Sequence, residues 1–370
     1  MQNNTINILL SKALEGEFLS LEEGVKLWKE ASIPQLMWTA NEIRKQKTNN
    51  SSIVGWIIDR NINITNICIA QCEFCNFYRR PGSEDGYITT MNEYIEKIDE
   101  LYELGGNQIL LQGGLHPKLG LDYYKGLFRM LKDMYPDLKL HALGPAEIHH
   151  IARMEGKDYE YVLRTLIDAG LDSLPGAGAE ILSDRVRNTI SKGKCNTQQW
   201  LDVMKVAHKL NMPTSATMMF GHIETIEERI NHLILIRDLQ AQKPKNSYGF
   251  LSFIPWPFQD KGTILATKRN IKNNVTSPEY VKMIAISRIM LPNIPNIQAS
   301  WLTVGIKTAQ VCLHAGANDM GSIMIEENVV SAAGKSIKVN KTEIQQAIKE
   351  AGFTPKLRNQ TFKYFDEVIQ

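Results

Sequence analysis

Short apolar runs and longer segments of helical period alternate along most of this 370-residue chain. The runs end in glycine, proline or polar clusters and are too short for helices, as is typical of buried strands. Strands that alternate with helices pair in parallel through right-handed crossovers. Eight such units predict an α/β fold, a closed (β/α)8 barrel of the TIM type rather than an open doubly wound sheet. The predicted strands are residues 61–67, 108–112, 138–143, 171–175, 213–219, 248–254, 296–301 and 316–320.

Helix signals occupy the segments between these runs. Apolar residues recur at helical spacing within 91–104, and two glycines follow as a stop signal. Thr225 and Glu228 form a capping-box pair at the start of a helix predicted at 225–239. These helices separate predicted strands, as a barrel of βα units requires.

Both ends of the chain extend beyond the eight predicted units. Residues 5–45 predict two short amphipathic helices, and a polar stretch separates them from the first strand. We therefore predict an N-terminal helical extension at 1–50, the barrel at 51–340 and a C-terminal helical extension at 341–370.

Composition restricts the class of protein. Hydrophobic residues make up 43% of the chain and charged residues 22%, as in ordinary globular domains, and the formal net charge is +2. The nearest basic cluster, RKQKTNN at 44–50, is interpreted as a solvated linker, so we expect no nucleic-acid partner. No stretch approaches the roughly 20 apolar residues that span a bilayer, and the N-terminus lacks a secretory signal. We therefore expect no membrane partner.

Three of the five cysteines, Cys68, Cys72 and Cys75, fall within eight residues directly after the first predicted strand. In a barrel, this is where the loops carry the chemistry. Three thiolates at this spacing can hold three irons of a [4Fe–4S] cluster and leave the fourth iron open, whereas most clusters use four cysteines. Such crowding fits a metal site better than a disulfide framework, and reduced thiolates indicate a cytoplasmic protein.

A structural zinc site is the alternative interpretation of this loop. It needs four ligands, usually in paired spacings. The nearest histidine, His116, lies beyond a predicted strand and helix, and Cys195 and Cys312 fall in helix-flanking and helical contexts. The spacing therefore favours the iron–sulfur cluster.

The C-x3-C-x2-C loop resembles that of the radical S-adenosylmethionine (SAM) superfamily, which implies a [4Fe–4S] cluster and SAM as cofactors. In that superfamily an aromatic residue before the last cysteine approaches adenine, and a glycine pair after the second strand receives the methionine amino group. Segments after the fourth and fifth strands touch ribose and adenine. Here Leu115 follows the glycine pair, where many members have Glu. The cofactor-binding residues that the resemblance implies are Phe74, Gln112, Gly113, Gly114, Glu180, Gly221 and Glu224.

A closer resemblance covers almost the whole chain. Segments such as LLQGGLHP, MMFGHIET and FIPWPFQ are similar to the cyclic dehypoxanthine futalosine synthases, a radical SAM family of the futalosine route to menaquinone. The resemblance implies that a 5′-deoxyadenosyl radical abstracts the ribose C4′ hydrogen of dehypoxanthine futalosine, after which C4′ closes onto the benzoate ring. The partners it implies are this small-molecule substrate and a low-potential electron donor such as flavodoxin or ferredoxin. The protein itself would orient the substrate and exclude water.

Two alternative functions stay open. Sister radical SAM enzymes, namely aminofutalosine synthase and the subunits of FO synthase, share the cysteine loop and differ in substrate. A non-catalytic iron–sulfur electron carrier would belong to a different class of protein. It would need a fully ligated cluster, and the missing fourth cysteine speaks against it.

Polar and aromatic residues at predicted strand ends are candidates for catalysis and substrate binding. The chemistry requires a base for a final proton, and His141 and His222 lie on or directly after predicted strands. Arginine can bind a carboxylate bidentately and tryptophan can wall an aromatic ring. An exposed arginine, core histidines and barrel-filling tryptophans are the structural alternatives. The substrate-binding candidates are Arg79, Trp256, Gln298, Trp301, Asn318 and Asp319.

Overall fold

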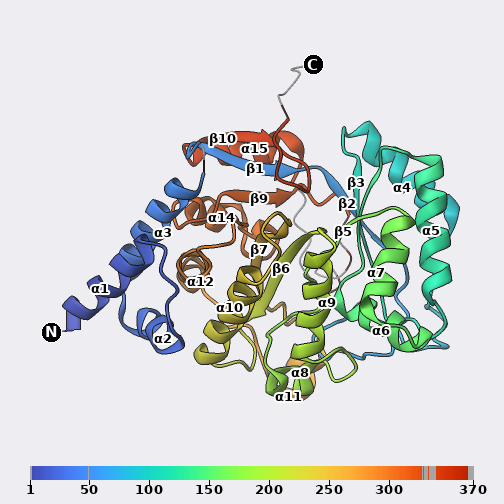
Figure 1. Cartoon of the computed structure of the whole chain (residues 1–370), viewed down its shortest axis with the longest axis horizontal. Helices are drawn as coiled ribbons and strands as arrows, with labels where there is room; N and C mark the ends of the chain where they lie inside the picture. Colours follow the sequence, from blue (N-terminus) through green and yellow to red (C-terminus); the bar gives the residue numbers. More distant parts are fainter. Residues whose placement is uncertain (1, 49, 327, 329–331, 333–338, 366–370) are drawn as a thin grey trace.

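The strands of the computed structural model form a ring at the centre of the molecule, and the named strands pair only in parallel (Figure 1). The structure describes residues 2–48, 50–326, 328, 332 and 339–365. The strands of the ring are β1 (Ile53–Ile57), β2 (Asp59–Asn63), β3 (Gln108–Gln112), β4 (Lys139–Ala142), β5 (Leu171–Ser173), β6 (Pro213–Phe220), β7 (Gly249–Pro257), β8 (Asn296–Ile297) and β9 (Asp319–Ser322).

Pairing between neighbouring sheets closes this ring. β1 and β2 are two halves of one extended segment, of which β1 pairs with β9 and β2 pairs with β3. Single bridges join the remaining gaps, because Leu174 pairs with Thr214 between β5 and β6, and Gln298 pairs with Asp319 between β8 and β9. With β1 and β2 counted as one strand, the ring has eight strands. The predicted (β/α)8 barrel is therefore confirmed.

Helices connect the strands and cover the outside of the ring. The helix predicted at 91–104 is present as α4, and Thr225 caps α10 through a capping box with Glu228. The helices of the barrel are α4 (Met91–Glu103), α5 (Leu121–Met134), α6 (Pro145–Glu155), α7 (Tyr159–Asp168), α8 (Asp184–Ile190), α9 (Thr197–Lys209), α10 (Ile226–Ala241), α11 (Ile264–Arg269), α12 (Ser277–Met290), α13 (Trp301–Val304) and α14 (Ile306–Leu313).

Two of the predicted strands end four residues beyond the observed ones. The strand predicted at 61–67 ends at Asn63, and the unpredicted β1 precedes it. A glycine interrupts the apolar run of β1 because a Cβ at Gly55 would lie 2.5 Å from the Oδ2 atom of Asp319. The strand predicted at 296–301 ends at Ile297, after which the chain turns into α13.

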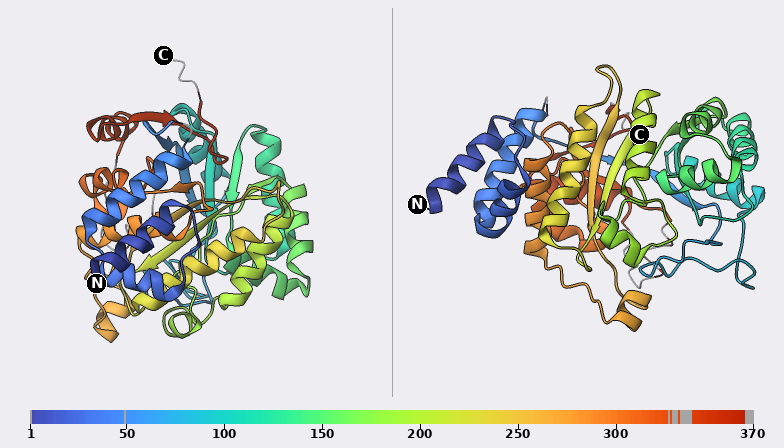
Figure 2. Two further views of the ribbon diagram at one scale, coloured as in Figure 1. Left: turned by 60° about the vertical axis from the view of Figure 1, so that its left-hand side comes forward. Right: turned by 60° about the horizontal axis from the view of Figure 1, so that its bottom comes forward.

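The N-terminal extension contains three helices where two were predicted. They are α1 (Gln2–Leu14), α2 (Leu21–Glu30) and α3 (Ile33–Lys47), and they lie beside α10 and α12 at one side of the barrel (Figures 1 and 2). The interpretation of 44–50 as a solvated linker was wrong for its first half, because α3 continues to Lys47. Within it, buried Arg44 donates to the Ser51 carbonyl over 2.8 Å.

The C-terminal part is not purely helical, in contrast to the prediction. After α15 (Lys341–Glu350), residues Thr354–Leu357 form β10, which pairs with β1 on the side opposite β9. Pro355 is compatible with this position because β10 is an edge strand. The division of the chain at residues 50 and 340 stays a prediction.

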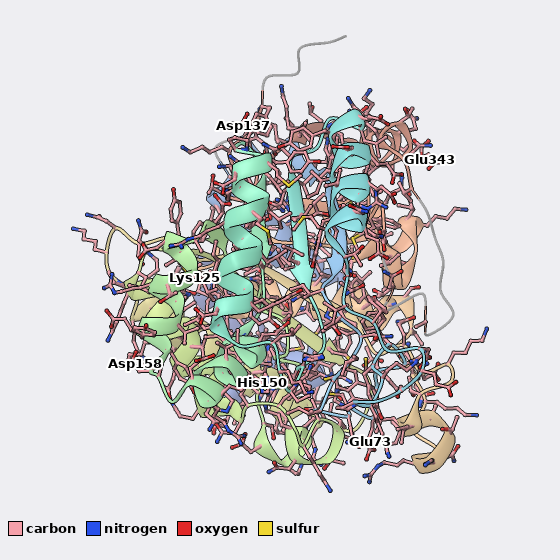
Figure 3. The ribbon with its side chains drawn as sticks, turned by 90° about the vertical axis from the view of Figure 1, so that its right-hand side faces the viewer. Glu73, Lys125, Asp137, His150, Asp158 and Glu343 are labelled. Atoms are coloured by element: carbon pink, nitrogen blue, oxygen red, sulfur yellow. The ribbon has the colours of Figure 1, made fainter. Side chains whose placement is uncertain are left out.

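The cysteine loop lies at one end of the barrel. Figure 3 shows Glu73, which belongs to the cysteine loop, at the lower end of the molecule, whereas Asp137, directly before β4, lies at the upper end. The cysteine loop therefore lies at the carboxyl ends of the strands, as predicted for the reactive end of a barrel. Among the helices that the structure describes, none is long and apolar enough to cross a membrane.

Candidate active site

A cavity of about 420 Å³ occupies the interior of the barrel. Alternate residues of a strand face the same side, so Asp59, Asn61 and Asn63 of β2 all line this cavity. The Oδ1 atom of Asn61 is buried and has no hydrogen-bond partner within the described part of the chain. Buried polar atoms normally have hydrogen-bond partners, so this part of the cavity wall can accept a hydrogen bond from a polar ligand.

The cysteine loop closes one end of the cavity. Cys68 and Cys72 are buried, Cys75 is partly buried, and all three free thiols line the cavity. The backbone N–H groups of Ala70 and Leu115 donate to Cys68 Sγ over 3.4 and 3.3 Å. Hydrogen bonds of this kind to ligating sulfur atoms help to set the properties of iron–sulfur clusters.

Contacts from distant parts of the chain hold this loop in place. The Glu73 N–H donates to the Ile190 carbonyl over 2.9 Å, and the Leu265 N–H donates to the Glu73 carbonyl over 3.0 Å. The Glu73 carboxylate also forms an ion pair with Arg269 of α11. The chain following β5 and the excursion following β7 therefore both fix the position of the thiols.

Two glycines allow close backbone contacts with the loop. A Cβ at Gly114 would lie 2.2 Å from the Ile67 carbonyl oxygen, and a Cβ at Gly193 would lie 2.4 Å from the Cα of Ala70. Real Cβ atoms are not found this close to backbone, so any other residue would displace the loop. The pair Gly113–Gly114 also lines the cavity, as does Gln112 before it.

A partly buried lysine lies beside the thiols. Lys194 Nζ lies 2.8 Å from Glu180 Oε1 and 5.3 Å from the centre of the Phe74 ring. Burial alone would lower the pKa of Lys194, but Cys72 and Glu180 beside it raise that pKa overall. Burial raises the pKa of Cys72 to about 12. Binding of a metal cluster must therefore displace protons from these thiols.

Glu180 occupies a strained position at the same end of the cavity. Its backbone has a φ of 41°, in the left-handed region. Its second carboxylate oxygen, Oε2, is 3.6 Å from Arg187 Nη1 and has no hydrogen-bond partner in the described chain. Arg187 instead donates to the carbonyls of Gly178 and Ala179 over 3.0 and 2.6 Å. Glu180 therefore has an acceptor available for a hydroxylated ligand.

His141 lies deeper in the cavity. Its Nδ1 atom is 2.7 Å from Ser173 Oγ, and its Nε2 atom is 3.4 Å from the amide nitrogen of Gln360. Because that amide nitrogen can only donate, Nε2 accepts and Nδ1 carries the proton. Burial lowers the pKa of His141 to about 3, so the imidazole is neutral at ordinary pH.

Twelve of the predicted site residues line this single cavity. They are Cys68, Cys72, Phe74, Cys75, Gln112, Gly113, Gly114, His141, Glu180, Trp256, Gln298 and Trp301. The residues that do not line it are Arg79, Gly221, His222, Glu224, Asn318 and Asp319.

His222 and Glu224 hold the turn after β6. The Ile223 N–H donates to His222 Nδ1 over 2.8 Å, and His222 Nε2 donates to the Met219 carbonyl over 3.0 Å. Glu224 accepts from the Gly221 N–H over 2.6 Å and lies 2.7 Å from Arg229 Nε. Both ring nitrogens of His222 are thus engaged away from the cavity.

The other three side chains outside the cavity wall also have structural partners. Arg79 pairs with Asp85 and donates to the carbonyls of residues 76–78. Asn318 accepts from Arg288 over 2.9 Å. Asp319 pairs through both carboxylate oxygens with Arg358.

The cavity contains charged residues that the sequence did not single out as site residues. Lys194 and Arg358 line it, and neither follows a predicted strand. Asn61 and Asn63 carried a usable signal, because they alternate with apolar residues within a predicted strand. Arg358 carried none, because β10 was not predicted.

The other two cysteines lie outside this cavity. Cys195 and Cys312 are buried, and the Cys195 carbonyl accepts from Arg187 over 2.5 Å. In the part of the chain that the structure describes, no three His, Cys, Asp or Glu side chains converge on a position for a single metal ion.

Two family models match the chain in succession. The model of the radical SAM superfamily matches residues 62–236, which run from β2 into α10. The model of the CofH/MqnC C-terminal region matches residues 247–370. Both matches include residues that line the cavity.

Curated relatives resemble the chain over nearly its full length. The cyclic dehypoxanthine futalosine synthase of Halalkalibacterium halodurans is 42% identical over 97% of this chain and 95% of its own length. The enzyme of the same name from Streptomyces coelicolor is 39% identical over 96% and 88%. The aminodeoxyfutalosine synthase of Thermus thermophilus is 37% identical over 96% and 94%.

Solved structures share the fold. Methylornithine synthase superposes with a TM-score of 0.71 at 20% identity, covering 95% of this chain and 98% of that one. At this identity the similarity establishes the architecture and not the reaction.

Proposed function

This chain belongs to the radical SAM superfamily, within the family that contains the cyclic dehypoxanthine futalosine synthases, and we propose that it converts dehypoxanthine futalosine to its cyclic form in menaquinone biosynthesis. The observation that carries this proposal is the similarity to those synthases along nearly the whole chain. The barrel cavity closed by three free thiols supports it independently.

We assign the cluster to Cys68, Cys72 and Cys75. Three thiols line one cavity, two backbone N–H groups point at the first sulfur atom, and no fourth cysteine lines the cavity. This donor set fits a [4Fe–4S] cluster with one open iron. When bound, the cluster and SAM would supply a 5′-deoxyadenosyl radical at the expense of one electron from a donor such as flavodoxin or ferredoxin.

We assign SAM to the space between the thiols and Glu180. Phe74, Gln112 and the Gly113–Gly114 pair line the cavity there, and the free Oε2 atom of Glu180 is suited to a ribose hydroxyl. Gly221 and Glu224 act indirectly, because they shape the turn after β6. The glycine pair lets a ligand approach the backbone closely.

The deeper part of the cavity takes the substrate. Trp256 and Trp301 wall an aromatic ring, and Trp301 is fixed by a 3.0 Å hydrogen bond from Nε1 to the Ser322 carbonyl. Gln298 offers an amide. Arg79 and Asn318 act by positioning the backbone, because their own partners occupy them. These walls hold the ribose C4′ hydrogen nearest to the radical and exclude water.

The overall reaction removes the C4′ hydrogen, joins C4′ to the benzoate ring, and releases one proton and one electron. His141 is the residue we assign to accept the proton. It lines the cavity and is neutral above about pH 3, whereas His222 does not line the cavity. A neutral imidazole nitrogen is an acceptor within the site.

Sister reactions are the second candidate, since an aminodeoxyfutalosine synthase is nearly as similar. Anaerobic assay of the reconstituted protein with dehypoxanthine futalosine, SAM and a low-potential reductant separates the two. The proposal predicts a product two hydrogens lighter than the substrate. An adenosyl adduct of an enolpyruvyl benzoate, with dehypoxanthine futalosine left unchanged, would instead identify the sister enzyme. We place the reaction in the cytoplasm, because the thiols must stay reduced.

A further inference from the structure

Two cations line the cavity among the described residues, and they lie at opposite ends. Lys194 lies beside the cysteine thiols and is paired with Glu180. Arg358 follows β10, and its N–H donates to the Trp56 carbonyl of β1, at the start of the barrel wall. Arg358 is therefore the cation at the floor of the cavity, the end away from the thiols.

The guanidinium of Arg358 is held rigidly at this floor. Its Nε and Nη2 atoms lie 2.5 and 2.8 Å from the two carboxylate oxygens of Asp319, and the Phe362 ring covers it at 3.9 Å. Gly55 leaves room for the pair, because a Cβ there would lie 3.2 Å from the Arg358 Cδ atom and closer still to Asp319. Asp319 is further fixed by the Gly321 N–H over 2.8 Å.

The pairing leaves part of the guanidinium unused. Arginine has five N–H donors. Within the described chain, Asp319 takes the Nε donor and one Nη2 donor, and the Asn359 carbonyl takes one Nη1 donor over 3.1 Å. One donor on each of Nη1 and Nη2 has no hydrogen-bond partner there. Nη1 and Nη2 together form the end-on face of a guanidinium, which can bind a carboxylate bidentately.

The groups around the fork permit an anion. Asp59 is the nearby acid that lines the floor, and burial raises its pKa, which favours the neutral carboxyl. Gln108 Nε2 donates to Gln360 Oε1 over 3.2 Å and approaches Asp59 Oδ2 at 3.4 Å. His141, which also lines the cavity, is neutral at ordinary pH. Burial therefore disfavours the negative charge on Asp59 that would compete with an anionic ligand.

We propose that Arg358 binds the benzoate carboxylate of the substrate at the barrel floor, with Asp319 as the residue that positions it. This inference rests on the proposed function, which supplies a substrate with a carboxylate at the end remote from the reacting ribose. The cavity is deep enough for this arrangement, because β2 extends about 13 Å from Asn63 to Asp59 at a strand rise of about 3.3 Å per residue. SAM at the thiol end and the substrate below it would together fill this depth down to the floor.

The test compares dehypoxanthine futalosine with its carboxamide analogue in the reconstituted holoenzyme. The wild type should show a kcat/KM about 30-fold or more higher for the carboxylate than for the amide, because a buried charge pair is lost with the amide. Arg358→Gln should reduce this preference to about threefold or less, mainly through a higher KM for the carboxylate. The EPR change of the reduced cluster on adding SAM, without substrate, should be as in the wild type.

Folding failure and general damage are controlled separately. Arg358→Gln leaves buried Asp319 unpaired, so the double variant Asp319→Asn/Arg358→Gln provides a neutral pair for the same comparison. Arg237→Gln removes another buried arginine, which donates to the Leu19 carbonyl and does not line the cavity. It should leave the carboxylate preference unchanged.

An unchanged preference in both Arg358 variants, or a wild type that uses both substrates equally, would overturn the carboxylate site while leaving the reaction intact. A wild type that cyclises neither compound, yet cleaves SAM, would overturn the proposed function itself.

Discussion

Lys194 and Glu180 form a partly buried 2.8 Å ion pair at the thiol end of the barrel cavity. Both residues line the cavity, and Phe74 covers the ammonium group. Both residues belong to the segment after the fourth predicted strand, and the contact with Phe74 places their ion pair beside the cysteine loop.

Replacing only the lysine of this ion pair should lower the stability of the protein. Lys194→Met leaves the buried Glu180 carboxylate with only Arg187, 3.6 Å away, as a cationic neighbour in the described chain, and we expect a loss of about 1–3 kcal/mol in the free energy of unfolding of the apoprotein. Lys194→Met/Glu180→Gln should recover most of that stability but still bind SAM poorly. Urea unfolding and SAM titration of the reduced cluster by EPR measure the two effects. Equal stabilities of the single and double variants would contradict this account.

The three cysteines of the loop should be required and the other two dispensable. Replacing Cys68, Cys72 or Cys75 by alanine should abolish both cluster assembly and SAM cleavage, because each removes an iron ligand. Cys195→Ala and Cys312→Ala should retain about one cluster per chain and SAM cleavage, since both lie outside the cavity. Iron and sulfide analysis with a 5′-deoxyadenosine assay measures this. Loss of the cluster in either of the last two variants would show that a fourth thiol is used.

The Gly114 position provides a test with a matched control. Gly114→Ala places a Cβ 2.2 Å from the Ile67 carbonyl, so the cysteine loop must shift and cluster assembly should fall at least tenfold. Gly126→Ala in α5 meets nothing within 4 Å and should stabilise the helix by up to about 1 kcal/mol without affecting the cluster. Cluster content of the two purified variants decides the question. Similar content in both would mean that the close approach is not needed.

Much of the fold could be predicted because the signals were local. Alternation of short apolar runs with capped helices gave the barrel, and the Cys68–Cys75 spacing gave the thiol loop. β10 could not be predicted, because Thr354–Leu357 has a proline and little apolar character and is a strand only through pairing with β1. His222 and Asp319 were reasonable candidates by position, but hydrogen bonds to distant or backbone partners turn both away from the cavity. The Arg358 partner of Asp319 is set by tertiary structure and leaves no local pattern, whereas the partners of His222 lie within three residues of it in the sequence.

Acid should destabilise the protein through its buried histidines. Burial lowers the pKa of His141, His208 and His232 to about 3, well below the usual value of 6.5. The unfolded chain then binds more protons than the native one between these values, so this stabilisation is complete above pH 6.5 and is lost as pH falls towards 3. The slope is up to about 1.4 kcal/mol per pH unit for each histidine. Urea unfolding of wild type and His141→Gln at pH 5 and 6.5 should show a smaller difference in the variant; equal differences would contradict the assignment for His141.

His141 should also matter for the reaction. His141→Phe removes the assigned proton acceptor, so formation of the cyclic product should fall about 100-fold or more, while SAM cleavage continues. The ratio of 5′-deoxyadenosine to product should therefore rise well above one. His222→Phe, by contrast, should keep a ratio near one in whatever activity remains. A ratio near one in both variants would remove His141 from the mechanism.

The most direct test of the central claim follows one hydrogen atom. Dehypoxanthine futalosine carrying deuterium only at the ribose C4′ is incubated anaerobically with SAM, reductant and the reconstituted protein. Mass spectrometry should find one deuterium in 5′-deoxyadenosine and none in the cyclic product, with about one SAM consumed per product. Unlabelled 5′-deoxyadenosine, with the deuterium still in the substrate or product, would contradict the account.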